Sequence, residues 1–245
     1  MIELIKHSYI TNNGSRPVNE DSGSIVRKNE RICFTVCDGL GGHGKGEVAS
    51  SAAAKTFSAI FKKTELEPSA FFDIAYKKAQ EIVRTLQSRD RHGFSMKTTV
   101  VSLVIADGKC TWSHLGDSRL YMFRNNEVKV RTLAHSVPQM LANSNEIEEK
   151  EIRFHPDRNR LLRVLGSDED APKFTVSDSV DLSECQAFLL CTDGFWELID
   201  EKQMCSLLKN SCSPEIWLRK MEETVLQNGK NIEMDNYTAI AVFTE

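Results

Sequence analysis

The chain has 245 residues, of which 40% are hydrophobic and 27% are charged, and its 31 basic and 35 acidic side chains give a formal net charge of -4. These values predict one globular domain over residues 1–245, and they disfavour disorder, a membrane span and a basic surface for nucleic acid. The first residues lack the charged leader and the apolar segment of a secretion signal, so we expect a cytoplasmic protein.

Seven cysteines are present, and none belongs to a C-x-x-C pair. This pattern argues against a zinc site and against a disulfide framework. Most of the cysteines stand inside apolar runs, so we predict buried, reduced thiols. No cysteine is followed by an arginine six positions later, which argues against the loop of the cysteine-dependent phosphatases.

A polar loop over residues 15–22 precedes the first predicted strand, which starts near Ser24. The apolar run 34–37 then ends at Asp38, and a glycine-dense turn leads to a helix pattern from Glu47. An acidic side chain therefore stands at a strand end, where the backbone must pass another group closely. We interpret this stretch as one half of a metal site.

The same turn has the spacing of a phosphate-binding loop, G-x-x-x-x-G-K, from Gly39 to Lys45. However, Gly46 stands where that loop needs a Ser or Thr hydroxyl for magnesium, and no repeated alternation of strand and helix follows. A third interpretation is a flexible turn with Asp38 in solvent. This stretch alone does not decide among the three.

Two amphipathic helices are predicted next, one over residues 47–61 and one that begins after Pro68 with Ser69 as its cap. Strands follow at 98–105 and 110–115, joined by the hairpin signal Asp107-Gly108. After a turn at 116–118, further strands are predicted at 119–124 and 127–131. Together these strands predict an antiparallel meander.

The pattern weakens between Ala134 and Gly166, where we expect a surface excursion with an acidic helix start and a turn at 155–159. Two strands close the core. Residues 187–192 end in Asp193-Gly194, and residues 238–243 follow Asp235-Asn236. Between them we predict a helix near 201–209 and a second one capped by Ser213, with Pro214 at its first position.

Carboxylates thus stand at strand ends or in strand turns at Asp38, Asp117, Asp193 and Asp235. Massed at one edge of a sandwich, they would repel one another unless cations held them together. Hard divalent cations, which oxygen atoms alone can bind, are the natural occupants of such a place.

Six short motifs carry a family resemblance, because they stand in the family's order and span nearly the whole chain. They resemble the motifs of the metal-dependent protein phosphatase 2C family in its compact bacterial form, although Lys97 replaces the usual glycine before the threonine pair. The motifs are Arg16 to Asp21, Asp38-Gly39-Leu40-Gly41-Gly42-His43, Met96-Lys97-Thr98-Thr99, Gly116-Asp117-Ser118-Arg119, Thr192-Asp193-Gly194-Phe195-Trp196 and Asp235-Asn236-Tyr237-Thr238. The resemblance implies an α+β fold, a four-layer α-β-β-α sandwich of two antiparallel β-sheets flanked by helix pairs.

The resemblance also implies a centre with two divalent cations, Mn2+ or Mg2+, at one end of the sandwich. Asp38 would bridge both ions. Glu20 and the Gly39 carbonyl would help to hold one ion, and Asp193 with Asp235 would hold the other. Two cations bridged by a carboxylate lower the pKa of a shared water, so that hydroxide attacks phosphorus in line without a protein nucleophile.

Four further residues have implied roles around this centre. Asp21 would support it through water, and Asp117 would bind a weaker third ion. The planar fork of donors on Arg16 suits the non-bridging oxygens of a phosphate. His43 would be the general acid, a partner of the ligands or a turn residue, since Leu40 stands where many eukaryotic relatives have their histidine.

We therefore predict a metal-dependent serine/threonine phosphoprotein phosphatase whose substrates are phosphorylated by a cognate kinase. Residues 135–167, the flap segment, match the family's variable flap and would influence substrate choice. One alternative is a catalytically silent relative that binds phosphoproteins, but Arg16, Glu20 and the main carboxylates are all present. The other is a nucleotide-binding enzyme that uses Gly39 to Lys45, which Gly46 disfavours.

Overall fold

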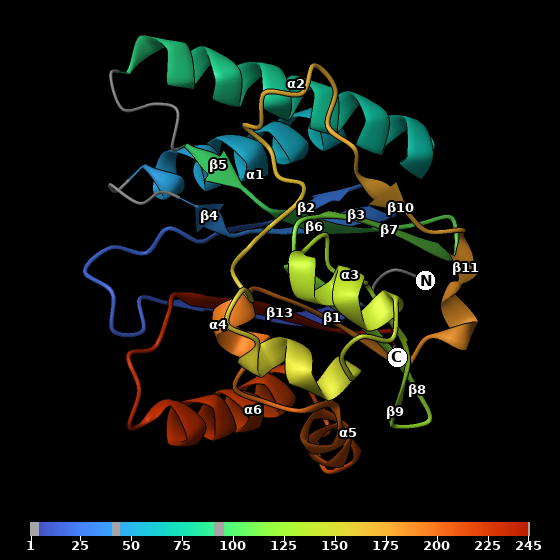
Figure 1. Ribbon diagram of the computed structural model, residues 1–245. Coiled ribbons are helices and arrows are strands. Elements are labelled where there is room, and N and C mark those ends of the chain that lie inside the picture. Colours follow the sequence, from blue (N-terminus) through green and yellow to red (C-terminus); the bar gives the residue numbers. More distant parts are fainter. Residues whose placement is uncertain (1–4, 41–44, 91–95, 245) are drawn as a thin grey trace.

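The structure is a computed structural model that describes residues 5–40, 45–90 and 96–244. Two antiparallel β-sheets lie face to face, and helices cover the outer face of each sheet (Figure 1). The layers therefore follow the order helix, sheet, sheet, helix. This arrangement confirms the predicted α+β sandwich.

The first sheet has five strands in the order β1-β13-β12-β8-β9, and all neighbours are antiparallel. Its strands are β1 Lys6–Asn12, β8 Arg119–Arg124, β9 Glu127–Arg131, β12 Ala187–Cys191 and β13 Tyr237–Phe243. No strand was predicted from the sequence at β1. This strand lies at the sheet edge and is only partly buried, so its sequence lacks the apolar run that identifies the inner strands.

The second sheet has the order β10-β7-β6-β3-β2, and the short strand β11 also pairs with β7. Its strands are β2 Ser22–Lys28, β3 Arg31–Cys37, β6 Val100–Ala106, β7 Lys109–Leu115, β10 Thr175–Val176 and β11 Val180–Asp181. A separate two-stranded sheet joins β4, Gly39–Leu40, to β5, Lys97–Thr98. This small sheet continues directly from β3, so it fixes the backbone on both sides of Asp38.

Helices α1, Gly46–Lys63, and α2, Pro68–Arg89, cover the second sheet, while α5, Glu201–Lys209, and α6, Pro214–Gly229, lie on the side of the first (Figure 1). Ser213 caps α6 as predicted, because its hydroxyl accepts a hydrogen bond from the Ile216 N–H at 3.3 Å. The predicted cap at Ser69 is wrong. Helix α2 begins at Pro68, whose fixed φ suits a first turn, and Glu67 is its N-cap.

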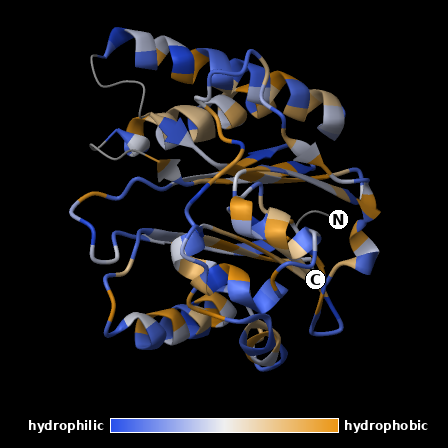
Figure 2. Cartoon of the chain, in the orientation of Figure 1, coloured by the Kyte–Doolittle hydropathy of each residue, from blue (hydrophilic) through white to orange (hydrophobic). Residues whose placement is uncertain are grey.

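Three apolar layers separate the four layers of secondary structure. The strand β3 contributes side chains to two of these apolar layers. Phe34 and Val36 pack between the sheets, whereas Cys33 and Cys37 pack toward α1 and α2. Figure 2 shows this division, with hydrophobic colour concentrated in the strands and on the inner helix faces. The alternation of side chains along each strand therefore produces the layered core.

The predicted meander is wrong at its middle turn. The hairpin turns at Asp107-Gly108 and Asn125-Asn126 both have positive φ, as two-residue hairpin loops require. Strands β7 and β8, however, belong to different sheets, and residues 116–118 cross from one sheet to the other. Alternation reveals which face of a strand is buried, but it does not reveal which sheet the strand joins. The crossing puts Asp117 at the end of the sandwich.

The flap segment crosses the front of both sheets (Figure 1). It contains α3, Val137–Asn143, the 3-10 helix η3, Glu149–Phe154, and the predicted turn at 155–159. The remaining short elements are the 3-10 helix η4, Leu182–Glu184, and helix α4, Asp193–Trp196. Among the described residues, no helix is long and apolar enough to cross a membrane.

Candidate metal centre

A cleft of about 620 Å³ lies beside the end of β3, the end of β12 and the start of β13. Asp38, Asp193 and Asp235, which stand next to these strand ends, line it together. Most of the predicted site residues line it, together with Asn159 and Leu161 of the flap segment. These site residues are Arg16, Glu20, Asp38, Gly39, Asp117, Asp193 and Asp235. Asp21 does not line this cleft, and His43 lies outside the described residues.

Asp38 is fixed through its backbone by the threonine pair of the third motif. Its N–H donates to Thr99 Oγ1 at 3.0 Å, and its carbonyl accepts from Thr98 Oγ1 at 2.8 Å and from the Thr99 N–H at 2.9 Å. Thr99 Oγ1 also lies 2.6 Å from Ser118 Oγ, next to Asp117. The threonine pair therefore connects two carboxylates that come from different strands.

We expect Thr99→Val to reduce turnover about tenfold and to destabilise the fold by roughly 1–3 kcal/mol, because it leaves the Asp38 N–H and Ser118 without their shared buried partner. Steady-state kinetics and thermal unfolding measure the two effects. The matched control is Thr56→Val, because Thr56 is also nearly buried but bonds only the Ala52 carbonyl in its own helix. Equal turnover in the two variants would contradict this role of Thr99.

Gly39 and Gly46 pack against each other, and Glu20 contacts both of them. A Cβ at Gly39 would come within 2.4 Å of backbone atoms of Glu20 and Gly46, and one at Gly46 would come within 2.6 Å of the Gly39 backbone. The Gly46 N–H donates to Glu20 Oε1 at 3.2 Å. The start of α1 therefore faces a carboxylate of the protein itself, which disfavours the phosphate-binding loop.

Asn236 organises the loop that carries Arg16 and Glu20. Its Oδ1 accepts from the Glu20 N–H at 2.8 Å, and its Nδ2 donates to the carbonyls of Asn13 at 2.9 Å and Val18 at 3.0 Å. This role was not predicted from the sequence. The only local signal was an Asp-Asn pair before a strand, and such a pair does not identify partners more than 200 positions away.

Arg16 and Asp235 form an ion pair, with Nη2 3.0 Å from Oδ2. Their side chains are 48% and 42% exposed, so the pair adds little stability. The charge of Asp235 also raises the pKa of Arg16 above its ordinary value. A phosphate would bind the Arg16 guanidinium, and a cation would bind the Asp235 carboxylate. Because these two groups bind each other in the structure, the ion pair would have to open.

Asp21 is buried outside the cleft and is bonded by hydroxyls. Thr192 Oγ1 donates to its Oδ2 at 2.9 Å and also accepts from the Thr238 N–H at 2.9 Å. Burial raises the pKa of Asp21 to about 7, although hydrogen bonds from Thr238 and Thr192 act in the opposite direction. This position suits a residue that supports the cleft carboxylates from behind.

The cleft carboxylates disturb one another's ionisation. Burial is the largest cause that raises the pKa of Asp38, followed by the charges of Asp193, Asp21 and Asp117. Burial likewise raises the pKa of Asp117 and of Asp193, and a neighbouring acidic charge adds to each shift. Crowded, buried oxygen donors are the kind of site that a hard divalent cation stabilises.

The donors fit such a cation by their chemistry rather than by their present spacing. Within the described ranges, no group of three or more His, Cys, Asp or Glu side chains is already arranged to hold a metal ion. Several carboxylates are instead held by protein groups, as Asp235 is by Arg16 and Glu20 by the Gly46 N–H. Coordination would replace these contacts.

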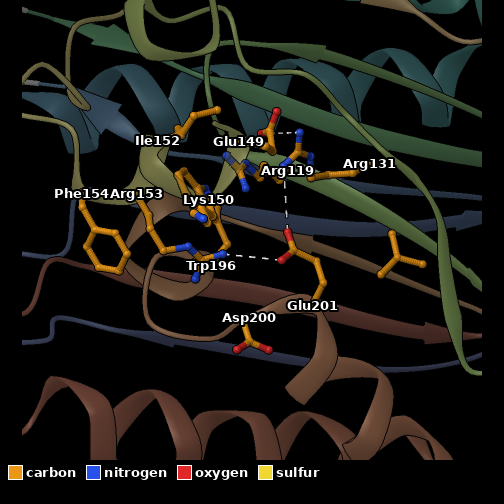
Figure 3. A pocket seen from close by; sticks show the side chains of 11 residues that line it. Arg119, Arg131, Glu149, Lys150, Ile152, Arg153, Phe154, Trp196, Asp200 and Glu201 are labelled. Atoms are coloured by element: carbon orange, nitrogen blue, oxygen red, sulfur yellow. Dashed lines mark hydrogen bonds and ion pairs between the residues drawn. The ribbon is translucent and has the colours of Figure 1, made fainter. Parts of the chain in front are cut away.

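A second pocket lies between η3 and the start of α5 (Figure 3). Arg119 is buried in its wall, with its guanidinium carbon 3.4 Å from the centre of the Trp196 ring. The Trp196 Nε1–H donates to the Asp117 carbonyl at 3.1 Å. The stacked pair therefore holds the backbone next to a cleft carboxylate.

Ion pairs in the same pocket anchor the flap segment. Arg153 of η3 lies 3.6 Å from Glu201, and its Nη1 donates to the carbonyls of Trp196, Glu197 and Ile199 at 3.2–3.3 Å. Figure 3 shows Glu201 between Arg131 and Arg153, with a dashed line to each. These contacts tie η3 to the helices beside the cleft.

Comparison with known proteins gives a consistent result. A sequence profile described as "Protein phosphatase 2C" matches residues 12–215. The serine/threonine phosphatase stp of Listeria welshimeri is 31% identical over 80% of this chain and 79% of that protein. Protein phosphatase PhpP of Streptococcus pneumoniae is 25% identical over 96% of both chains.

Solved structures show the same fold at low sequence identity. The crystal structure of serine/threonine phosphatase Stp1 from Staphylococcus aureus has a TM-score of 0.90 at 23% identity, covering 98% of this chain and 95% of that one. The catalytic domain of phosphatase PstP, solved with two manganese ions, has a TM-score of 0.81 at 22% identity and covers 98% and 97%.

Proposed function

The chain belongs to the protein phosphatase 2C family, and from this premise we propose that it hydrolyses phosphoserine and phosphothreonine esters in proteins. One observation carries the proposal, namely that carboxylates from distant strands meet in one cleft beside Arg16. A silent phosphoprotein-binding relative is not favoured, since the cleft keeps its full set of acidic side chains. A nucleotide-binding enzyme is disfavoured by the contact between Glu20 and the Gly46 N–H.

We propose that Asp38, Asp193 and Asp235, with Glu20 and the Gly39 carbonyl, hold two divalent cations, Mn2+ or Mg2+. Such ions, when bound, acidify water and offset the charge of a phosphoryl group. The structurally similar PstP domain with two manganese ions supports the choice of metal. The crowding of buried carboxylates around Asp38 supports the choice of ligands.

The remaining residues of the cleft position these groups and the substrate. Thr98 and Thr99 fix the backbone of Asp38, and Asn236 fixes the loop that carries Arg16 and Glu20. Arg16, once released from Asp235, presents parallel N–H donors to the non-bridging oxygens of the phosphate. We further propose that Asp117 holds a weaker third ion, that Asp21 supports the ligands from behind and that His43 assists the leaving group.

The setting in the cell is also a proposal. We infer one catalytic domain over residues 1–245, located in the cytoplasm, with substrates supplied by a serine/threonine kinase. The apolar layer between the sheets supports a single folding unit, because it draws residues from both sheets. Membrane and nucleic acid are not expected partners, since the net charge is -4 and the described helices contain no candidate span.

Hydrolysis of an aryl phosphate and of a phosphothreonine peptide tests the proposal. We expect both to be hydrolysed with added Mn2+ or Mg2+, and we expect chelator to reduce each rate by at least about a hundredfold, since the ions supply several kcal/mol of transition-state stabilisation. Readdition of metal should restore the rate. Binding of the phosphopeptide without turnover in metal would instead favour the silent relative.

The flap segment is proposed to influence which phosphoproteins are accepted, because its Asn159 and Leu161 line the cleft. We expect Arg153→Met to alter the ratio of kcat/KM between two phosphopeptides about three- to tenfold, since it removes the contacts that hold η3 to Glu201 and to three carbonyls. Hydrolysis of the small aryl phosphate should change less. Arg219→Met, which breaks an exposed pair with Glu223, is the control. An unchanged ratio would exclude this role.

A further inference from the structure

Three sulfur atoms meet in the core between the sheets. Cys110, near the start of β7, has its Sγ 3.8 Å from the Sγ of Cys185, which follows η4. The Cys185 Sγ in turn lies 3.5 Å from the Met122 Sδ of β8. Cys110 is fully buried, while Cys185 is 3% exposed. The two thiols are therefore in contact although 75 positions separate them.

The surrounding backbone holds the two cysteines near each other. Cys110 pairs with Val180 across β7 and β11, and the Leu182 N–H donates to the Gly108 carbonyl at 2.8 Å. The Cys185 N–H donates to the Leu182 carbonyl at 3.0 Å, which closes the short turn of η4. The sulfur atoms must approach by less than 2 Å to reach bonding distance, because a disulfide bond is about 2.0 Å long.

We propose that Cys110 and Cys185 form an oxidation site in which hydrogen peroxide produces an intramolecular disulfide. The sequence predicted buried, reduced thiols. All seven cysteines are free of disulfide bonds in the structure, but Cys205 is only partly buried and Cys212 is exposed. Contact between two thiols sets this pair apart from Cys33, whose sulfur contacts the hydroxyls of Thr35 and Ser102.

The two sulfur atoms have different roles in the reaction. Cys110 donates a hydrogen bond to Cys185, which lowers the pKa of Cys185 and raises that of Cys110. The Cys185 thiolate is therefore the better nucleophile for the peroxide. It attacks one oxygen, the O–O bond breaks, and Cys185 becomes a sulfenic acid while the departing hydroxide takes up a proton to become water.

Cys110 then resolves this intermediate. Its sulfur attacks the Cys185 sulfur, an S–S bond forms and the S–O bond breaks, and the hydroxide that leaves takes the Cys110 thiol proton to become a second water. The two sulfurs lose two electrons in total and the peroxide gains them. The bond would link β7 of the second sheet to the connection that enters β12 of the first, and it would enclose the flap segment.

Intact-mass measurement and peptide mapping test the proposal on the whole protein. Reduced protein is treated with hydrogen peroxide in chelator, quenched, alkylated in denaturant and examined as the monomer. Before alkylation we expect a loss of 2 Da, and after it we expect unalkylated, cross-linked peptides containing Cys110 and Cys185. Dithiothreitol should reverse both. The melting temperature should rise by roughly 5–10 °C, as expected for a cross-link that closes a long loop.

Cys110→Ala should abolish the mass loss, whereas the equally buried Cys33→Ala should keep it. Both variants must first show wild-type hydrolysis of the aryl phosphate, which separates this result from failure of the proposed function. Three outcomes would each overturn the proposal. They are a disulfide between any other cysteines, sulfenic or sulfinic acid at Cys185 without a disulfide, and full alkylation of both Cys110 and Cys185. Peptide mapping of the wild-type protein shows whether Cys110 and Cys185 become linked, even if Cys110→Ala fails to fold.

Discussion

Asp38→Asn is expected to reduce metal-dependent hydrolysis of an aryl phosphate at least about a hundredfold, and more if the proposed bridge between two ions is lost entirely. The substitution keeps the shape of the side chain but removes the charge that would join the cations. It leaves the backbone contacts to Thr98 and Thr99 in place. Steady-state kinetics over a range of Mn2+ concentrations measure both the rate and the metal requirement.

Stability distinguishes this result from simple misfolding. Burial raises the pKa of Asp38, and repulsion by the charges of Asp193, Asp21 and Asp117 raises it further. Removing its charge should therefore leave the melting temperature in chelator equal to or above that of the wild type. Asp107→Asn is the matched control, because Asp107 stands in the remote β6–β7 hairpin at a positive φ that asparagine tolerates. Equal rates for wild type and Asp38→Asn would refute the proposed centre.

Gly46→Ser should destabilise the fold by roughly 1–3 kcal/mol and reduce activity more than tenfold. A Cβ there would lie 2.6 Å from backbone atoms of Gly39 and 2.9 Å from the Glu20 carboxyl carbon, so α1 or the loop of Glu20 must shift. Thermal unfolding and aryl phosphate hydrolysis measure the two effects.

The same substitution separates the two interpretations of the glycine-dense turn. A serine after Lys45 completes the sequence of a phosphate-binding loop, so a nucleotide enzyme would gain ATP affinity in magnesium. We expect no ATP binding. Gly108→Ser is the control, since no atom lies within 4 Å of its Cβ position and only the positive φ opposes the change. Tight ATP binding by Gly46→Ser would revive the nucleotide interpretation.

The sequence predicted the inner strands and the long helices because each has its own period of apolar residues. It also identified the carboxylates at strand ends, where Asp38 and Asp193 each follow an apolar run. It failed where the signal was not local. The edge strand β1 has little apolar character, and the crossing at Asp117 depends on which sheet each hairpin joins.

The support around the candidate site was the least predictable part. Asn236 bonds three backbone groups of a loop near the other end of the chain, and Thr99 connects Asp38 to Ser118. These residue types are common in turns and strands, so their presence reveals nothing about a distant partner. The ion pair of Arg16 with Asp235 was missed for another reason, because the resemblance assigned each of them a different role.

The strand β13 lies between β1 and β12, and it begins directly after Asp235 and Asn236. Arg16 and Glu20 therefore each gain one of their partners only when residues near position 235 are present. While the ribosome is still adding residues before that point, the growing polypeptide lacks both a carboxylate of the cleft and the side chain that orders Glu20. We therefore expect the nascent chain not to hydrolyse phosphoproteins until the stretch around Asp235 and Asn236 has been synthesised.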